Sequence, residues 1–406
     1  MSYILSKEFI FSILLLSGTL KAILPLIGLA GIPDITLLSA LVVSLIMFRD
    51  MKETLLSLDH NRVELLGIII FFYLFIMYSL SYSSSMDASI TKTINFGTMV
   101  LAFIFPLLVK EFNIKKFMII STIIIFLLSI VFFNFYTAYL NRDVSILLSI
   151  GKETALHLTA LYLTISWLNG IVILYYFFQK IISPYLKWSI LIIAFIFILS
   201  AGGRGPLIFT LLILGAYVLL ELFNTLLTFK INKLMIPILI MLTLATSTIM
   251  IVSSVKLEQY NKSLKLVDNT VERLMEFTNT NDGGASAHSR IVNAKFSIKK
   301  INEAPFFGYG IGSYGYEKNH IDELDYPHNI FLEVWFELGF LPLLLFMLLF
   351  YKVYKNINPS QSPWALALFF FFLLNLLKSS SLIDIRMMLG FYAMFITIES
   401  YKQSTN

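Results

Sequence analysis

Cysteine is absent from this 406-residue chain, and charge is scarce, since only 14% of the residues are Asp, Glu, Lys or Arg. The lack of cysteine excludes disulfides, cysteine-based metal sites and a thiol nucleophile. The lack of charge excludes an ordinary soluble domain, in which about 25% of residues are charged. Hydrophobic residues make up 58% of the chain, and the mean hydropathy is +0.81. These values predict an all-α membrane protein that crosses the bilayer many times.

Two further features are missing. Lys7 precedes a first apolar run, but no Ala-x-Ala type cleavage site follows it, so we interpret this run as an uncleaved first span. No internal repeat of the kind found in many transporters stands out. The formal net charge of +5 needs no nucleic-acid partner, because lysines at membrane boundaries account for it.

The apolar runs predict the number of crossings. Each crossing needs about 20 apolar residues, and we count about twelve candidates. Their approximate limits are 8–28, 33–48, 64–82, 95–112, 117–139, 156–179, 185–201, 205–224, 234–255, 329–351, 363–378 and 381–399. We therefore expect spans 1–9 within residues 1–255, a large loop at 256–327, and spans 10–12 with a short tail at 328–406.

Lysine and arginine in the short loops predict the orientation. One side of the membrane holds about 14 of them and the other about 6, and the richer side is the cytoplasmic one. Both termini are then inside, and the 256–327 loop is outside. The six basic residues assigned to the outer short loops are Lys92, Arg142, Lys152, Arg204, Lys378 and Arg386.

The outer loop is long enough to suggest a function rather than a simple connection. Two amphipathic stretches lie in it, VDNTVERLMEF at 267–277 and SRIVNAKFSIKKI at 289–301. In the second, Ser289 is a predicted N-cap. Its expected apolar face consists of Ile291, Ala294, Ile298 and Ile301.

A glycine-rich segment, GIGSYG at 310–315, follows the second stretch. It matches G-x-G-x-x-G, but a dinucleotide site needs a strand before it and a helix after it, and here an amphipathic helix and Pro305 come first. We expect a turn packed by the neighbouring aromatic residues Phe306, Phe307, Tyr309 and Tyr314. Gly310 and Gly312 would leave backbone amides open to a ligand.

Two arginines are candidates for anion binding. Arg204 follows Ser-Ala-Gly-Gly in a very short outer turn, where it either snorkels to the surface or meets an anion. Its guanidinium can hold phosphate oxygens in a bidentate fashion. Arg290 is expected at the start of a helix in the outer loop, where it is either a solvated charge or part of an anion site.

The segment ELDYPHNIFLEVWFELGF places acid–base groups at the next span. His328 stands between Pro327 and Asn329, and Asn329 is a predicted helix cap. A histidine there is either an ordinary interfacial residue or a proton acceptor. Glu333 and Glu337 share one helix face, and two acids in a membrane segment need partners. The candidates are Lys378, Arg386 and Arg290.

Three of these blocks together resemble the O-antigen polymerase and ligase superfamily of bacterial cell-surface glycan assembly. They are SAGGRGPLIF, SRIVNAKFSIKKINEAPFFGYGIGSYGY and YPHNIFLEVWFELGFLPLLLF. Their order and spacing resemble those of the family, as does the large outer loop before the last spans. The resemblance covers roughly residues 188–349, and it extends to the N-terminal spans only by hydropathy.

The resemblance implies a GT-C-like fold and an inverting glycosyltransferase without metal or cofactor, in the bacterial inner membrane with its site facing the periplasm. The implied donor is a glycan on undecaprenyl diphosphate, bound through Arg204 and Arg290. His328 matches the family's histidine that assists the acceptor hydroxyl. Glu333, Glu337, Arg386, Gly310 and Gly312 are possible supporting residues. Membrane lipids and a chain-length regulator protein are the other implied partners.

The exact activity stays open between related possibilities. A polymerase joins one lipid-linked repeat unit to another, and the YPHNIFLEVWFELG form favours it. A ligase transfers the finished chain to lipid A-core. A polysaccharide transporter or flippase would instead place charges near the middle of the bilayer and use paired broken helices. A non-catalytic scaffold would tolerate replacement of Arg204, Arg290 and His328.

Overall fold

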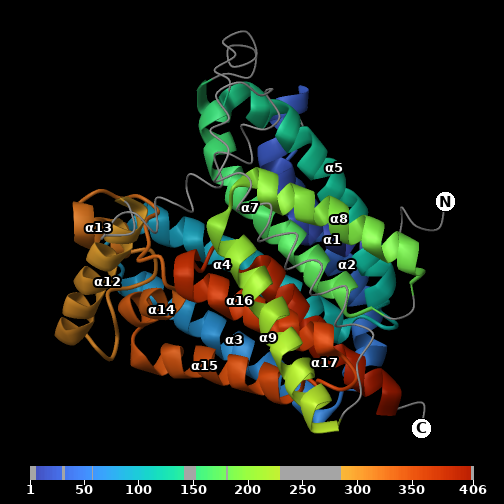
Figure 1. The fold of residues 1–406 in the computed structure, drawn as a ribbon. Helices are drawn as coiled ribbons and strands as arrows, with labels where there is room; N and C mark the ends of the chain where they lie inside the picture. The colour runs from blue at the N-terminus through green and yellow to red at the C-terminus, as the bar shows by residue number, and fades with distance from the viewer. Residues whose placement is uncertain are drawn as a thin grey trace. The chain divides into compact units, whose positions relative to one another are not determined.

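The computed structural model describes residues 6–29, 33–56, 58–140, 152–179, 182–228 and 285–403 (Figure 1). The expected span at 234–255, the amphipathic stretch at 267–277 and Arg142 lie outside these ranges. Within them the chain forms helices and no β-strand, which confirms the predicted all-α class. The helices divide into two compact units, which we describe one at a time.

Six helices among the described residues are long and apolar enough to cross a membrane. Three further apolar helices among the described residues are shorter, Leu161–Phe177, Pro363–Ser379 and Arg386–Thr397. The multi-pass architecture follows from physical necessity, because a backbone in lipid must satisfy its hydrogen bonds internally. The six spans are Lys7–Ile27, His60–Tyr82, Met86–Leu108, Ile114–Tyr136, Pro184–Ala201 and Arg204–Phe223.

The first unit combines residues 1–21, 31–121 and 285–406, so both ends of the chain contribute to it. Helix α4 (Met86–Leu108) packs against α17 (Arg386–Gln403) and α2 (Ile35–Leu55), while α3 (His60–Ser79) packs against α15 (Phe340–Lys355). Stacked aromatic rings join these segments, such as Phe72 and Phe346 with centroids 5.3 Å apart. The unit also contains α1 (Lys7–Ile23), the first turns of α5 (Ile114–Leu140), α12 (Ala285–Glu303), α13 (Tyr314–Asn319), α14 (Ile330–Leu338) and α16 (Pro363–Ser379).

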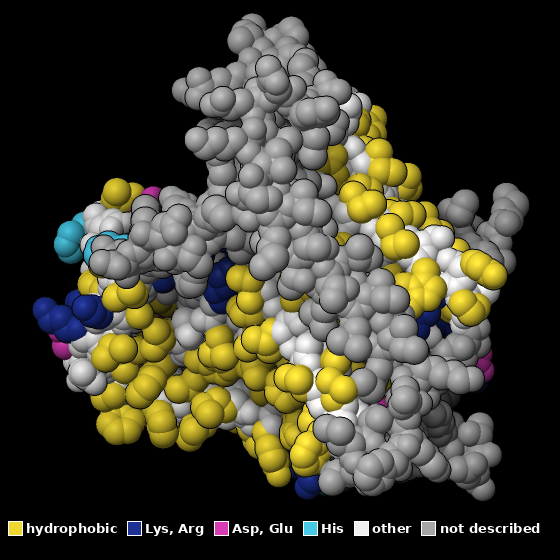
Figure 2. Space-filling model, viewed as in Figure 1, with side chains coloured by type: hydrophobic (Ala, Val, Ile, Leu, Met, Phe, Trp, Pro, Cys, Tyr) yellow, Lys and Arg dark blue, Asp and Glu magenta, His cyan; other side chains and the backbone are white. Residues whose placement is uncertain are grey.

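The solvent-accessible surface of this unit is apolar over α15. Figure 2 shows hydrophobic side chains gathered over α15. Leu341, Leu344, Met347 and Tyr351 are among the exposed large side chains of that helix. An exposed apolar surface of this extent is typical of a membrane-facing protein face.

Contacts within the first unit pair loops that the sequence assigns to the same side of the membrane. The Ser85 hydroxyl donates to Asp322, and both residues belong to predicted outer segments. On the predicted inner side, Lys352 pairs with Glu64 at 2.6 Å, and Asn61 donates to Asn356 at 3.0 Å. This pairing is what the predicted alternation of spans requires.

The expected tenth span at 329–351 is wrong in its limits, because Gly339 divides it into α14 and α15. Gly339 has a φ of 88°, and a Cβ there would lie 2.0 Å from the carbonyl oxygen of Phe306. The amide of Phe340 donates to Pro305 at 3.1 Å, so the turn after α12 is seated at the break. The longer of the two helices is α15, which ends at Lys355, four residues later than predicted.

The fourth span also begins earlier than the predicted residue 95. Helix α4 starts at Met86, so Lys92 lies inside it and is 1% exposed. Lys92 is therefore not a loop lysine, and Arg386, another residue assigned to an outer loop, is the first residue of α17. The hydropathy pattern placed both residues outside the spans. A charged residue lowers the hydropathy of a segment even when a partner inside the protein allows that residue to be buried.

The second unit contains residues 22–30 and 122–284 and holds α7 (Lys152–Phe177), α8 (Pro184–Ala201) and α9 (Arg204–Thr228). Helix α7 packs against α8 and α9. The turn between α8 and α9 is tight, with Gly202 in the left-handed region at φ 78°. The amide of Gly203 donates to the Ser166 hydroxyl at 3.1 Å, which ties this turn to α7.

Candidate functional site

His328 ends the predicted outer loop, two residues before α14 begins at Ile330. Asn329 caps this helix, since its side-chain oxygen accepts from the amides of Phe331 at 3.0 Å and Leu332 at 3.1 Å, which confirms the predicted cap. The Asn329 side-chain amide also donates to Leu377 of α16 at 3.1 Å. His328 itself has a φ of 61°, a left-handed conformation that few non-glycine residues adopt. The residue that follows the histidine is thus held firmly.

The loop that leads to His328 is anchored at two points. The Asp322 carboxylate accepts from the amides of Asp87 at 3.1 Å and Ala88 at 3.0 Å, and so it caps α4. The Ser85 hydroxyl and these amides lower the pKa of Asp322. Further along, Lys318 of α13 pairs with Asp325 at 2.9 Å. The loop is therefore bound to both α4 and α13 before it reaches the histidine.

The imidazole of His328 lies in a partly buried and electropositive environment. Its ring meets the Tyr326 ring edge-on, with centroids 4.6 Å apart. Its Nδ1 atom is buried and has no hydrogen-bond partner among the described residues. Burial and then the charge of Arg290 lower the pKa of His328, with a small opposite effect from Asp325. His328 is consequently neutral at pH 7 and able to accept a proton.

Arg290 lies close enough to act on this loop electrostatically. Its positive charge influences both His328 and Tyr326, and burial raises the pKa of Tyr326 to about 12. The structure thus brings together two of the three residues predicted for the site. The predicted N-cap at Ser289 is wrong, because α12 begins at Ala285 and Arg290 lies in its second turn. Helix-terminal amides do not explain an anion site at Arg290.

The expected buried face of α12 is also wrong. Only Ile301 of the four predicted residues is buried, whereas Ile291 and Ile298 are about half exposed. Asn293 and Ser297 face the interior instead. The Ser297 hydroxyl donates to the backbone carbonyl of Asn293 at 2.8 Å, which compensates for the burial of this hydroxyl.

The two glutamates of α14 meet a lysine from α4. Lys92 Nζ pairs with Glu333 and lies 2.7 Å from Glu337 Oε1. Glu333 also accepts from the Ser381 hydroxyl at 2.7 Å and the Leu382 amide at 3.0 Å. All three ionisable side chains are almost fully buried. This ion cluster, Lys92 with Glu333 and Glu337, joins α14 to α4 and to the turn between α16 and α17.

The predicted partners of the glutamates are therefore wrong, since Lys92 replaces Lys378, Arg386 and Arg290. The Arg386 guanidinium is held elsewhere in the unit. It donates to the Ser17 hydroxyl of α1 and, at 3.0 Å, to the Thr98 hydroxyl of α4. These contacts give Arg386 a role in helix packing.

The glycine-rich turn is built into the protein. The Gly310 amide donates to the Glu337 carbonyl at 2.8 Å, and the Gly312 amide interacts with the Glu337 side chain. Both glycines have positive φ values, and a Cβ on either would strike the backbone near Ser83 or Ser89. Tyr309 and Tyr314 pack against Phe336 as expected, but Phe306 and Phe307 are exposed. The turn supports the ion cluster, and its Gly310 amide is already occupied.

Arg204, the third predicted site residue, belongs to the second unit. It is the first residue of α9, directly after the Gly202–Gly203 turn, and it is partly buried. A Cβ on Gly203 would lie 2.3 Å from the Ser166 hydroxyl oxygen, so the glycine is needed for the close approach of the turn to α7. The geometry that the glycines provide fixes Arg204 at the end of its helix.

Sequence reasoning missed three residues of this region. Tyr326 and Asp325 lie in a loop, and no pattern identifies their contacts. Lys92 could have been identified from the sequence, because it is the single charged residue of the segment SITKTINFGTMVLAFIF. A charged residue in such a segment implies a partner inside the protein.

Comparisons with known proteins agree with this segment of the chain. Residues 189–347 match the family model described as O-antigen ligase. The resemblance to the O-antigen ligase and polymerase superfamily is confirmed. A Rickettsia felis protein named "Putative polysaccharide ligase" is 36% identical over 89 residues, 19% of this chain and 22% of the relative. A Rickettsia conorii protein of similar name is 38% identical over 85 residues, 18% of this chain and 21% of the relative. The alignments thus span about a fifth of each relative.

Proposed function

We propose that this protein transfers a glycan from undecaprenyl diphosphate to an acceptor hydroxyl at the outer face of the bacterial inner membrane. The observation that carries the proposal is the pairing of Arg290 with a neutral His328 at the end of the outer loop. An anion-binding cation and a proton acceptor then lie near each other. The match to the O-antigen ligase family covers both residues and Arg204.

In the proposed reaction the acceptor oxygen forms a bond to the anomeric carbon, and the bond from that carbon to the phosphate oxygen breaks. The lipid diphosphate leaves with the electron pair, and attack from the opposite face inverts the anomeric configuration. Arg290 and Arg204 stabilise the charge on the leaving diphosphate without a metal ion. Arginine suits this role because its planar guanidinium binds phosphate oxygens in pairs.

His328 accepts the proton that the acceptor hydroxyl loses. Its lowered pKa keeps the imidazole unprotonated at neutral pH, so that it can accept the proton of the acceptor hydroxyl. The ion cluster does not take this role, because every carboxylate in it is already hydrogen-bonded within the protein. The division of labour is two arginines for the donor and one histidine for the acceptor.

The acceptor distinguishes two versions of the proposal. The sequence form around His328 favours a polymerase, which elongates lipid-linked repeat units. The names of the matched family and of the two relatives favour a ligase, which transfers the finished chain to lipid A-core. Deletion of the gene followed by analysis of surface polysaccharide separates them. One-repeat lipopolysaccharide indicates the polymerase, and bare core with accumulated lipid-linked chains indicates the ligase.

The proposed side of the membrane can be tested directly because the chain has no cysteine. We expect Asn279→Cys in the outer loop to react with an impermeant thiol reagent on intact spheroplasts. Ser360→Cys, in the predicted inner loop between α15 and α16, is the control and should react only after lysis. The reverse pattern would place the site on the cytoplasmic side and refute the proposal.

A further inference from the structure

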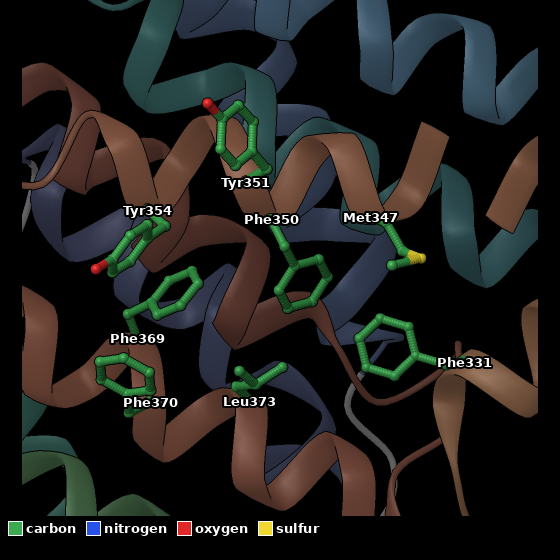
Figure 3. Close-up of a pocket in the computed structure, with 8 residues that line it drawn as sticks. All are labelled: Phe331, Met347, Phe350, Tyr351, Tyr354, Phe369, Phe370 and Leu373. Atoms are coloured by element: carbon green, nitrogen blue, oxygen red, sulfur yellow. The ribbon is translucent and has the colours of Figure 1, made fainter. Parts of the chain in front are cut away.

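Two exposed phenylalanines lie in the turn that follows α12. The side chains of Phe306 and Phe307 are 69% and 71% exposed. Aromatic side chains elsewhere on the same unit pack on one another, as Tyr354 does on Phe369 in the apolar pocket of Figure 3, with ring centroids 5.6 Å apart. Phe306 and Phe307 make no such ring contact with the described residues. Their rings therefore project from the described part of the chain.

The backbone of this turn is held firmly, in contrast to its side chains. The Pro305 carbonyl accepts from the Trp335 indole of α14 at 3.0 Å and from the Phe340 amide of α15 at 3.1 Å. The Phe306 carbonyl accepts from the same amide at 3.3 Å and lies against Gly339, at the break between the two helices. Because the backbone is already ordered, contacts made by the projecting rings cost little conformational entropy.

A direct hydrogen bond connects the turn to the end of a membrane span. The Tyr82 hydroxyl donates to the Phe307 carbonyl at 2.9 Å, and Tyr82 is the last residue of the span that begins at His60. Exposed large side chains recur along this span at helical spacing, and they are Ile70, Phe71, Leu74, Met77 and Tyr78. The Tyr78 and Tyr82 rings meet with centroids 5.7 Å apart. The turn is thus continuous with a stripe that faces lipid.

We propose that Phe306 and Phe307 form a membrane anchor, which inserts at the headgroup boundary of the outer leaflet and holds the C-terminal end of α12 there. Tyrosine and tryptophan are enriched at this boundary, where the ring is in apolar surroundings and the polar group keeps a hydrogen bond. Tyr82 and Trp335 meet this description, because both donate to carbonyls of the turn. The inference does not depend on the function proposed above.

The size of the projecting surface favours lipid over a protein partner. A phenylalanine side chain buries at most about 150–250 Å². Two of them supply well under the roughly 800 Å² per partner that a stable protein interface needs. A lipid surface has no such minimum, and the stripe on the adjoining span already faces it.

The anchor gives α12 a second attachment. This helix packs against α14, and the turn fixes its end to the bilayer surface. Arg290 lies about 20 Å along the helix from Glu303, at 1.5 Å per residue. In Figure 1, α12 and α14 lie near the same end of α15. An anchored turn therefore restrains the height at which this helix presents its outer-loop side chains.

The depth of the anchor can be measured on the full chain, which has no cysteine of its own. A nitroxide is attached to Phe306→Cys, and its accessibility to oxygen and to a water-soluble nickel complex is measured in nanodiscs of phosphatidylethanolamine and phosphatidylglycerol. Leu74→Cys, within the span, is the reference in lipid. Ile321→Cys is the control in water, because Ile321 is a loop residue that is 56% exposed and lies between His320 and Asp322.

We expect the ratio of oxygen to nickel accessibility at Phe306→Cys to be well above that at Ile321→Cys and closer to that at Leu74→Cys. A ratio equal to that at Ile321→Cys would place the turn in water and overturn the proposal. Low accessibility to both reagents would show that protein covers the ring, for example a second copy of the chain, and would also overturn it. Thermal midpoints equal to that of the parent verify that the labelled proteins are folded.

Hydrogen exchange tests whether the anchor holds α12. The double variant Phe306→Ser, Phe307→Ser removes both rings and keeps the hydrogen-bonded backbone. The matched control is Ile291→Ser, Ile298→Ser, which removes two α12 side chains that are 52% and 51% exposed. In nanodiscs we expect the C-terminal turn of α12 to exchange about tenfold faster in the first variant, equivalent to about 1.4 kcal/mol, and at the parent rate in the control. Equal effects in the two variants, or none in either, would refute the anchor.

Discussion

Helix α14 and the residue just before its cap both carry groups that can bind protons, but their surroundings are opposite. Within the helix, Glu333 in the first turn and Glu337 near the last residue receive Lys92, a serine hydroxyl and backbone amides. At the N-terminal end, His328 has a buried Nδ1 with no partner among the described residues and a pKa lowered by burial and by Arg290. The carboxylates already have hydrogen-bond partners within the protein, whereas the imidazole can still form a hydrogen bond with a ligand.

This difference separates scaffold from site. A buried charge whose hydrogen bonds are all made within the protein has little left to offer a ligand, and its removal leaves its partner uncompensated. A neutral imidazole beside a cation is suited to bind reactants that carry an anionic group and a hydroxyl proton. Mutations in the ion cluster should therefore affect stability, whereas mutations at His328 and Arg290 should affect turnover.

The largest effect is expected from the arginines. Arg290→Ala and Arg204→Ala should each abolish product while the protein still inserts, because the leaving diphosphate loses its stabilising charge. Lysine at either position should rescue poorly, since it keeps the charge but loses the paired donors. Lys299→Ala, an exposed change on the same helix as Arg290, is the control and should be active. Full turnover in Arg290→Lys would contradict bidentate binding of the diphosphate.

The next effect is expected at His328. His328→Ala should lower turnover by about 10²–10⁴-fold if the imidazole takes the acceptor's proton. His328→Gln keeps a hydrogen-bonding group but cannot accept a proton at neutral pH, so it should fail almost as severely. Elongation of purified lipid-linked repeat units is the measurement, with donor binding assayed in parallel and His288→Ala as the control.

Two outcomes would change the role of His328. Near-normal turnover in His328→Gln would mean that the residue only positions a hydroxyl. Loss of donor binding in His328→Ala would place it in the diphosphate site and remove the proposed division between arginines and histidine.

The ion cluster should show a stability effect instead. Lys92→Met leaves two buried carboxylates without their cation, a change that costs about 3–5 kcal/mol in comparable buried pairs. The triple variant Lys92→Met, Glu333→Gln, Glu337→Gln removes all three charges and should recover most of this loss. Thermal midpoints of the purified proteins in one detergent test both statements. A triple variant as unstable as Lys92→Met would show that specific hydrogen bonds, and not charge balance, hold α14.

Much of the fold was predictable because lipid leaves the backbone few options. The spans at α1, α3, α5, α8 and α9 follow from apolar length alone, and the cap at Asn329 follows from residue type. The break at Gly339 was not predictable, because its cause is the carbonyl of Phe306, which tertiary folding brings against that glycine. From sequence alone, an apolar run that contains a glycine predicts one continuous helix. The break becomes visible only when the backbone that packs against the glycine is known.

The candidate site was less predictable than the spans. Arg290 lies close enough to His328 to lower its pKa, and the functional roles of both residues stay predictions. Arg204 belongs to the other unit and is described within that unit alone. The partner of Glu333 and Glu337 escaped prediction because Lys92 is more than two hundred residues away in the sequence. Local patterns show that a buried charge needs a partner, but they do not show which one.

The smallest effect is expected from the charges that tune His328. Turnover should be constant around neutral pH and fall on the acid side as the imidazole takes up a proton, and the lowered pKa places this fall below pH 6.5. Asp325 raises the pKa of His328, so Asp325→Asn should move the acid limb to lower pH. Lys318 lowers that pKa, so Lys318→Gln should move the limb to higher pH. Asparagine keeps the side-chain oxygen that accepts from the Tyr326 amide at 2.8 Å, and the loop should therefore stay in place.

The measurement is kcat/KM against pH for the two variants and the wild type. Opposite displacements would identify the imidazole as the group that titrates. Displacements of the same sign, or an acid limb that neither variant moves, would show that another group controls the reaction and that His328 is not its base.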